Sequence, residues 1–300
     1  MAGKGTGPFE SVLITGISGL VGSAVFRVIE PLAGKVTGLF RRHPFAADGG
    51  GRFLAVDLRD ATALRRVLDE VSPTLVVNCA ACPDIAPCET DPRSTHRINV
   101  ASPVLMAAFC AERGARFVHI SSDQVFDGRK GGYSEADPLS PVHEYGRGKA
   151  EAERRVLAAN GRAVVARISL VIGKSYLGTR SSSESLLANI RKGASLRLFT
   201  NEFRTPVLVD DVARAVLSLA TDDFSGLVNV AGPDRVNRLE LGKALAARFG
   251  LSAAGLHAAL SDGLGARPPR PLDLSLDTSL AAGLLPFRLR GLDEALAVLS

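Results

Sequence analysis

Short apolar runs alternate with amphipathic stretches along the first half of the chain, and this alternation restricts the fold more than any other feature. The runs are rich in β-branched and aliphatic residues, as in strands of a parallel sheet that is covered on both faces. Between them, apolar residues recur with helical spacing, for example from Leu64 to Val71. We predict strands at residues 12–15, 35–40, 53–56, 74–79, 116–120 and 163–168.

The order of these elements is strand, helix, strand, strand, helix, strand, helix, strand, helix, strand, beginning with a strand and a helix at 20–32. With right-handed crossovers it predicts an α/β fold, a Rossmann-like doubly wound parallel sheet. After Ser169 we expect four helices. The first spans 183–192, the second is capped by Asp210 and Asp211 and ends at Leu219, the third follows a capping box of Asn237 and Glu240, and the fourth begins at Leu292. We also expect strands at 206–209 and 227–230. We assign the Rossmann domain to residues 1–168 plus 205–228 and a smaller C-terminal lobe to residues 169–204 plus 229–300.

Composition and charge exclude several other classes. With 46% hydrophobic and 22% charged residues the chain is an ordinary globular one, and no apolar stretch reaches the roughly 18 residues of a membrane span. The net charge is +5, but the basic residues are scattered, so we expect no nucleic-acid binding. The low-complexity start MAGKGTGPFE lacks the apolar core of a signal peptide, which favours a cytoplasmic protein without membrane contact.

Three of the four cysteines, Cys79, Cys82 and Cys88, stand within ten positions and could form a metal site with His96. Structural zinc usually takes two closely spaced pairs, whereas this chain has one, and Cys79 ends an apolar run. We therefore expect small buried thiols and no metal. Four cysteines are also too few for a disulfide framework, so we expect them to be reduced.

Glycines at the junction of the first strand and the first helix predict a dinucleotide site. Such spacing arises by chance about 0.3 times in a chain of this composition, so the strand and helix around it carry the inference against a merely structural turn. Gly16 permits a tight turn, Gly19 permits close approach of a pyrophosphate, and Gly22 permits close helix packing. The helix N-terminus would hold the phosphates. The cofactor contacts predicted in this loop are Gly16, Ser18, Gly19, Leu20 and Val21.

The end of the second strand indicates which dinucleotide binds. An NAD-selective site has Asp or Glu there, whereas this strand ends in Arg41 and Arg42. Guanidinium groups suit a 2′-phosphate, so we expect NADP(H), with NAD(H) as the alternative if both arginines only face solvent. Asp57, which ends the third strand, is expected either to contact the adenine or to cap the next helix.

Tyr145 and Lys149 lie four residues apart in a predicted helix at 144–159, and such a pair is expected by chance about 0.07 times. A nearby ammonium lowers the pKa of a phenol, which makes it a usable acid or base, and Lys149 could also hold ribose hydroxyls. Ser122 ends the fifth strand and can donate to a substrate carbonyl if it meets Tyr145, although alone it reads as a turn residue. Asn99 could brace Lys149 through water or be solvated.

Together these residues resemble the extended short-chain dehydrogenase/reductase superfamily, and within it the dTDP-4-dehydrorhamnose reductase family. The resemblance runs nearly end to end, and its more specific segments are SSDQVFDG from Ser121, FRTPVLVDDVA from Phe203 and LSLDTSLAAGLL from Leu274. It implies that Ser122 orients a keto oxygen, Tyr145 protonates it as NAD(P)H delivers hydride, and Lys149 tunes Tyr145 and grips the cofactor. Further cofactor contacts implied are Leu58, Cys79, Ala80, Ala81 and Asn99, and substrate contacts are Asp123, Gln124, Leu170 and Arg204.

The substrate implied by the resemblance is a nucleotide-linked 4-keto-6-deoxysugar, but two positions depart from the family pattern. Gln124 stands where members commonly have Tyr, and Leu170 where they have Trp, so another nucleotide sugar or ketone fits as well. Gln124 also argues against dehydration, because an amide cannot move a proton at neutral pH. A nucleotide-sugar epimerase and a non-catalytic protein resembling the regulatory subunit of methionine adenosyltransferase remain alternatives, and a homodimer is possible.

Overall fold

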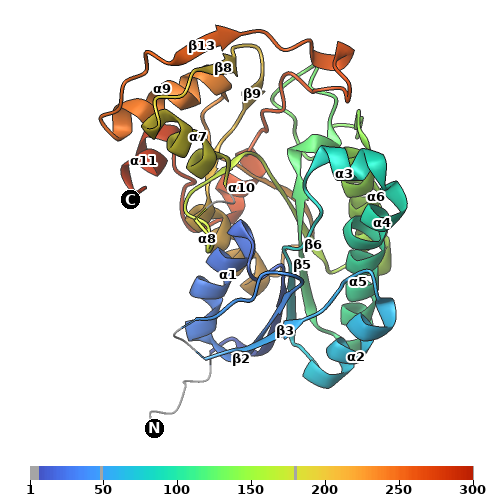
Figure 1. The fold of residues 1–300 in the computed structure, drawn as a ribbon. Coiled ribbons are helices and arrows are strands. Elements are labelled where there is room, and N and C mark those ends of the chain that lie inside the picture. Colours follow the sequence, from blue (N-terminus) through green and yellow to red (C-terminus); the bar gives the residue numbers. More distant parts are fainter. Residues whose placement is uncertain (1–6, 48–49, 179–180, 300) are drawn as a thin grey trace.

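The computed structural model describes residues 7–47, 50–178 and 181–299, so most of the low-complexity start of the chain lies outside the described residues. Seven parallel strands form one central sheet with helices on both faces (Figure 1). In spatial order the strands are β11 (Gly226–Val230), β6 (Val164–Ile168), β5 (Arg116–Ser122), β4 (Leu75–Asn78), β1 (Phe9–Thr15), β2 (Ala33–Phe40) and β3 (Arg52–Ala55). This topology confirms the predicted doubly wound α/β fold.

All six strands predicted in the first half are present, each within three residues of its predicted ends. The chain begins in the middle of the sheet, extends to β3, and then crosses over to β4, so the strand order reverses between β1 and β4. Thr15 and Asn78 are paired at the ends of these two strands. In open α/β sheets, ligands bind outside the carboxyl ends of the strands at this point of reversal.

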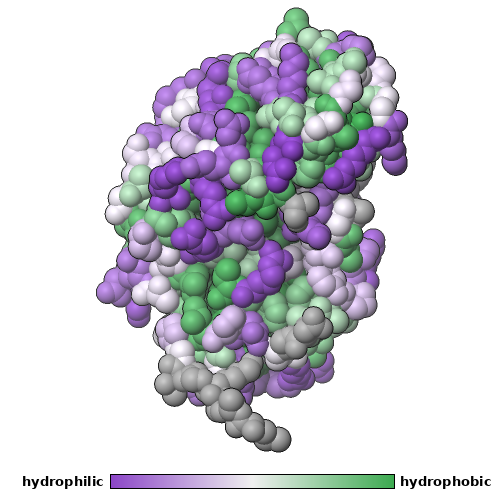
Figure 2. Space-filling view, turned by 90° about the vertical axis from the view of Figure 1, so that its left-hand side faces the viewer, coloured by the Kyte–Doolittle hydropathy of each residue, from purple (hydrophilic) through white to green (hydrophobic). Residues whose placement is uncertain are grey.

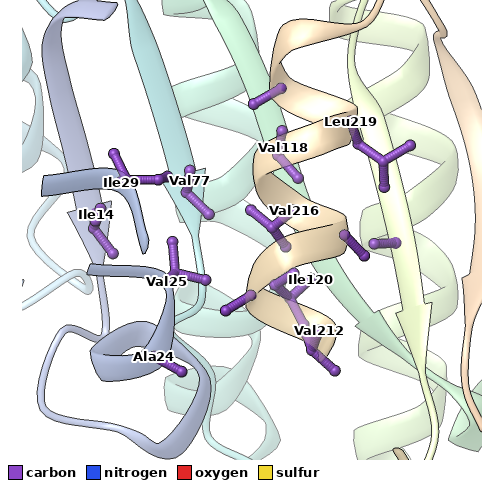
Figure 3. Close-up of a cluster of buried hydrophobic side chains, with 14 of the residues drawn as sticks. Ile14, Ala24, Val25, Ile29, Val77, Val118, Ile120, Val212, Val216 and Leu219 are labelled. Atoms are coloured by element: carbon purple, nitrogen blue, oxygen red, sulfur yellow. The ribbon is translucent and has the colours of Figure 1, made fainter. Parts of the chain in front are cut away.

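Two layers of helices cover the sheet. Helices α1 (Leu20–Ile29) and α8 (Val209–Thr221) pack on one face, where Val25, Val118 and Val216 belong to one buried cluster (Figure 3). The other face is covered by α2 (Ala61–Val71), α5 (Ser102–Arg113) and α6 (Glu144–Ala159). Full burial of one such side chain stabilises the fold by about 1.5–3 kcal/mol, so both layers are firmly fixed. As a result, α6 holds its first two turns at a defined place beside the sheet.

The connection from β4 to α5 is helical but irregular. It consists of α3 (Ile85–Thr90), α4 (Pro92–His96) and a π-helical turn (Arg97–Ala101). A π-helical turn inserts an extra residue into the helical repeat and often occurs at functional sites. Here it carries Asn99, one of the predicted cofactor residues.

A third hydrophobic cluster lies in the C-terminal part of the chain, where Ile190, Leu245 and Leu296 come together. The short strands pair as β7 (Val171–Ile172) with β10 (Val207–Leu208), β9 (Phe203–Arg204) with β12 (Val236–Asn237), and β8 (Leu196–Phe199) with β13 (Leu256–Ala259). The helices are α7 (Ser182–Arg191), α9 (Arg238–Arg248), α10 (Ser279–Leu284) and α11 (Leu292–Ala297). Strands β8, β9 and β13 and helices α7, α9 and α11 lie above the sheet in Figure 1, whereas α10 packs beside β11. The predicted domain boundaries remain a prediction.

The capping box predicted at the start of α9 is confirmed, because Asn237 and Glu240 cap each other's backbone N–H groups. The expectation that Asp210 and Asp211 cap α8 is wrong. Helix α8 begins one residue earlier, with Leu208 as N-cap, so both carboxylates lie in its first turn. They still favour the helix there, because negative charge is stabilised near a helix N-terminus.

In the described part of the chain, no helix has the length and hydrophobicity to cross a membrane. Figure 2 shows hydrophilic and hydrophobic side chains mixed over one face of the molecule. Such a mixed surface is usual for a folded protein.

Candidate active site

The glycine loop between β1 and α1 leaves no room for side chains. Gly16 has a φ of +66°, and a Cβ there would lie 2.9 Å from the Ala80 backbone. At Gly22 a Cβ would lie 2.2 Å from the Gly16 carbonyl oxygen, so α1 presses against the loop. Gly19 is the N-cap of α1 without a side-chain cap, and the first turn holds no acidic residue, which suits an anion. The other residues predicted here, Ser18, Leu20 and Val21, are half-buried.

Arg41 and Arg42 follow β2 directly and are exposed. Among the described residues, neither guanidinium makes a hydrogen bond or lies within 4 Å of a carboxylate. Both charges are therefore available to a ligand at the carboxyl end of β2.

Asp57 pairs with Arg59, whose Nε donates to both carboxylate oxygens over 2.9 and 3.0 Å. The Arg59 side chain lowers the pKa of Asp57 to about 2. The alternative that Asp57 caps α2 is wrong, because Asp60 is the N-cap and accepts from the backbone N–H of Ala63. Leu58 is half-buried against the cluster beneath α2.

The predicted helix at 144–159 is confirmed as α6, and its start is fixed by His143. His143 Nδ1 accepts from the Gly146 N–H over 3.0 Å, and its Nε2 lies 3.0 Å from Gln124 Oε1. Burial lowers the pKa of His143, so the ring is neutral and Nε2 donates to Gln124. This arrangement fixes the turn that carries Tyr145.

Tyr145 is half-buried, and Ser122, whose hydroxyl donates to Asp123, is near enough to influence its phenol. Burial raises the pKa of Tyr145, and Ser122 lowers it in part. The expectation that Lys149 lowers this pKa is not met in this structure, because the ammonium is directed elsewhere. Lys149 Nζ donates to the Ile120 carbonyl over 2.6 Å and lies 3.2 Å from His119 Nε2. Tyr145 is therefore protonated at neutral pH and can donate a proton.

Asp123 lies next to Ser122 and is buried with several partners. The Ser122 hydroxyl donates to Asp123 Oδ1 over 3.1 Å, the Ser169 hydroxyl donates to Oδ2 over 3.0 Å, and Arg204 Nε lies 3.7 Å from Oδ2. Burial raises the pKa of Asp123, and Arg204 opposes this effect. Ser122 has a single proton, so it must turn away from Asp123 to donate to a ligand.

Arg204 is buried, and its Nη atoms donate to the carbonyl oxygens of Phe203, Leu272 and Pro271. It therefore acts first as a fixed cation beside Asp123.

Arg238, at the start of α9, was not singled out from the sequence because no motif marks it. Burial and the charge of Arg204 lower the pKa of Arg238 to about 10. The described residues give it no hydrogen bond, and Glu202 is 3.9 Å away.

Leu170 is half-buried and packs against the hydrophobic cluster of the C-terminal part. Its side chain is thus partly used in holding that cluster together. Gln124, the other departure from the family pattern, is engaged by His143, as described above. Neither side chain offers an ionisable group to a substrate.

The Asn99 amide contacts the loop after β4 and makes no direct hydrogen bond to Lys149 among the described residues. Its Oδ1 accepts from the Cys82 N–H over 2.8 Å, and its Nδ2 donates to the Cys82 carbonyl over 3.1 Å. The π-helical turn places the amide against the loop after β4, which holds Cys79, Ala80 and Ala81, all half-buried. Asn99 therefore shapes this loop.

All four cysteines are free thiols, of which Cys88 and Cys110 are buried and Cys79 and Cys82 half-buried. The described residues contain no group of three or more side chains suited to hold a metal. A cavity of about 550 Å³ lies between α4, the π-helical turn and α6, lined by His96 and Glu151 among others. Its lining does not include Ser122, Tyr145 or Lys149.

A family model for the RmlD substrate binding domain matches residues 10–299. The probable low-salt glycan biosynthesis reductase Agl14 of Haloferax volcanii is 31% identical over 294 residues, which cover 95% of this chain and 96% of that protein. Methionine adenosyltransferase 2 subunit beta of Xenopus tropicalis is 30% identical over 306 residues, which cover 96% of this chain and 88% of that protein.

Solved structures share the fold. The hypothetical dTDP-4-dehydrorhamnose reductase from Sulfolobus tokodaii is 26% identical with a TM-score of 0.81, covering 94% of this chain and 98% of that one. MoeE5 in complex with UDP-glucuronic acid and NAD is also 26% identical with a TM-score of 0.81, covering 96% and 97%. A Bacillus anthracis dTDP-4-dehydrorhamnose reductase in complex with NADP is similar in fold alone, with 18% identity, a TM-score of 0.82, and coverage of 96% and 97%.

Proposed function

Because the chain belongs to the family of the RmlD substrate binding domain, we propose that it is an NAD(P)H-dependent reductase of a 4-keto-6-deoxy nucleotide sugar. One observation carries this proposal. A protonated phenol, Tyr145, lies beside the Ser122 hydroxyl at the carboxyl end of β5, and Lys149 follows one helical turn later. A proton donor at this edge of the sheet suits reduction of a carbonyl group.

The residues of the glycine loop fit a dinucleotide. An added Cβ at Gly16 or Gly22 would collide with backbone atoms, so the tight loop needs glycine there, and the first turn of α1 is uncapped and free of acidic residues. Arg41 and Arg42 favour NADP(H) over NAD(H). A bound reduced nicotinamide supplies the hydride.

The protein's own residues handle the proton and the carbonyl oxygen. Ser122 turns its hydroxyl from Asp123 to the ketone oxygen, and Tyr145 donates its phenolic proton to the same atom. The carbonyl carbon gains a hydride and its oxygen gains a proton, so the ketone becomes a secondary alcohol. Lys149 holds positive charge beneath the site and binds ribose hydroxyls.

On the substrate side, Arg204 and Arg238 lie near Asp123 and Glu202. Arg238 is half-buried, makes no hydrogen bond among the described residues and has only a loose ion pair with Glu202, so its guanidinium can bind a phosphate, and we assign it to the nucleotide diphosphate of the substrate. Gln124 and Leu170 line the sugar side in this proposal. UDP-sugar binding by MoeE5, which shares the fold, supports a nucleotide sugar.

The test is a reductase assay with keto nucleotide sugars, followed by the loss of NADPH absorbance near 340 nm. Tyr145→Phe is expected to lower kcat by about 10²–10⁴-fold because the proton donor is lost, with the Kd for NADPH within threefold of the parent. Tyr176→Phe, which removes an exposed hydroxyl that accepts from Ala46, is the matched control and should stay within twofold. Full activity of Tyr145→Phe would refute the assigned role.

A second candidate is a non-catalytic, NADP-binding regulatory subunit, favoured by the 30% identity to methionine adenosyltransferase 2 subunit beta. It predicts NADPH binding without turnover of any keto nucleotide sugar, and capture of a partner enzyme. An epimerase would instead retain its cofactor during purification and cause no net oxidation of added NADPH.

A further inference from the structure

A row of buried polar side chains runs from Lys149 into the sheet, and the reaction proposed above uses none of them except Lys149. We call it the Lys149 relay: Lys149 on α6, His119 on β5, Asn78 on β4 and Thr15 on β1. His119 Nε2 lies 3.2 Å from Lys149 Nζ, and His119 Nδ1 lies 2.8 Å from the Asn78 amide. Thr15 Oγ1 donates to Asn78 Oδ1 over 2.5 Å and accepts from the Ala80 N–H over 3.2 Å, so Asn78 presents its Nδ2 to His119 in this structure. All four side chains are at most 2% exposed.

The charge of Lys149 favours one of two arrangements of hydrogens, because a neutral amine that kept donating to His119 would leave its own buried lone pair without a donor among the contacts described here. An ammonium can only donate, so a charged Lys149 requires His119 Nε2 to accept and Nδ1 to carry the proton. Asn78 must then present its oxygen to His119, which its amide can do by exchanging the places of oxygen and nitrogen. If Lys149 is a neutral amine, it can accept from a protonated Nε2, and Asn78 presents its nitrogen to Nδ1.

The charges around Lys149 decide between the two arrangements. His119 and the Ile120 carbonyl face it from β5, Glu153 from its own helix, and Cys79 from the loop after β4. Burial lowers the pKa of Lys149 to about 8, and Glu153 opposes this effect. Burial and Lys149 keep the pKa of His119 well below its usual value, so its ring is neutral.

We propose that His119 is a positioning residue: protonated at Nδ1, it accepts a hydrogen bond from the Lys149 ammonium, and it changes to the Nε2-protonated tautomer when Lys149 becomes a neutral amine. The ring itself neither gains nor loses a proton in this exchange. Lys149 releases one proton to solvent, and the Asn78 amide turns over. His119 thereby holds the charged lysine in place, and the consequence for turnover rests on the proposed function.

Nitrogen-15 NMR of the histidine rings in the unliganded protein tests the exchange without any substrate. At pH 6.5 the His119 signals should show a neutral ring protonated at Nδ1. Between pH 7 and 9.5 they should change to the Nε2-protonated pattern with a midpoint near 8, and Lys149→Met should abolish the change. A charged ring at pH 6.5, or one tautomer across the whole range in the parent protein, would overturn the proposal.

Turnover gives the second readout, if the chain is a reductase. His119→Leu removes the acceptor of the Lys149 ammonium. The pH at which kcat falls on the alkaline side of its profile should therefore decrease by about one unit. His119→Gln, whose amide oxygen can accept from Lys149, should restore the limb. Thr37→Val, a buried polar position on β2 outside the relay, is the control for destabilisation alone. An unmoved limb in His119→Leu contradicts the positioning role, whereas a protein inactive on every ketone fails the proposed function and leaves the NMR result to decide on His119.

Discussion

Lys149 is an ammonium with 2% of its surface exposed, and burial lowers its pKa from 10.5 to about 8. Between these two values the unfolded chain binds more protons than the folded one, so stability rises with pH from about 8 to 10.5. Below pH 8 the cost of burying the charge is fully present. Lys149 therefore destabilises the fold at neutral pH while it holds positive charge at the site.

Lys149→Met is accordingly expected to raise the free energy of unfolding at pH 7 by about 2 kcal/mol, which is less than the full shift because two hydrogen bonds are lost. Urea denaturation at pH 7 and pH 10 measures it, and the gain should shrink at the higher pH. Lys192→Met, at an exposed lysine, is the control. A loss of stability in Lys149→Met at pH 7 would show that its hydrogen bonds outweigh the burial of its charge.

Arg41 and Arg42 determine the choice of cofactor in our proposal. Replacing both by Ala should raise the Kd for NADPH at least tenfold, because two guanidiniums at the 2′-phosphate are lost, and should leave the Kd for NADH within threefold. Isothermal titration calorimetry with each cofactor measures both constants. Arg66→Ala, at an exposed arginine of α2, should change neither. An equal loss of affinity for NADPH and NADH would mean that the arginines do not bind the 2′-phosphate.

Tyr145 and Lys149 could be found from the sequence because their spacing and the scarcity of both residue types make the pair conspicuous. The sequence could not identify His119 in this way, because a single histidine in an apolar strand is usually a buried core residue. The contact of Asn99 with the Cys82 backbone could not be predicted for a related reason, since it depends on a π-helical turn that no sequence pattern marks.

At the scale of elements, two helical glycines have opposite roles. Gly22 in α1 lies against the glycine loop, and a Cβ would come within 2.2 Å of a backbone oxygen, whereas a Cβ at Gly148 in α6 would make ordinary contacts at 3.7 and 3.8 Å. Gly22→Ala should destabilise the protein by about 1–3 kcal/mol and weaken NADPH binding. Gly148→Ala, its matched control, should stabilise the protein by about 0.5–1 kcal/mol. Thermal unfolding with and without NADPH measures both, and similar effects of the two changes would contradict this view of the loop.

The long, doubly buried strands and the capped helices were predictable because periodicity and capping residues are local signals. Strands β7, β9 and β12 have two residues each, too few to show any periodicity, whereas β10 lies within the strand predicted at 206–209. Strands β8 and β13 were missed altogether, since they pair only with each other across sixty residues of chain. Their formation depends on tertiary packing.

At the scale of the molecule, Arg238 comes from the C-terminal part of the chain and lies near Arg204 and Asp123. The site that we propose for the substrate is therefore assembled from distant segments. Arg238→Gln should raise the KM for a nucleotide sugar about tenfold or more and leave kcat within threefold, because a phosphate contact far from the reacting carbonyl acts equally in ground and transition states. Steady-state kinetics measures both constants. Arg197→Gln, at an exposed arginine of β8, is the control. An unchanged KM for Arg238→Gln would rule out its phosphate contact.

Every member of the Lys149 relay, together with Ser122 and Tyr145, comes from residues 15–149, whereas Arg204 and Arg238 come from later segments. In our proposal the groups that move the proton thus come from one continuous stretch of the chain, and most of the substrate contacts come from later segments, with Gln124 as the exception. Grafting the later segments of a relative onto this sheet, together with its residue at position 124, should therefore transfer its choice of substrate.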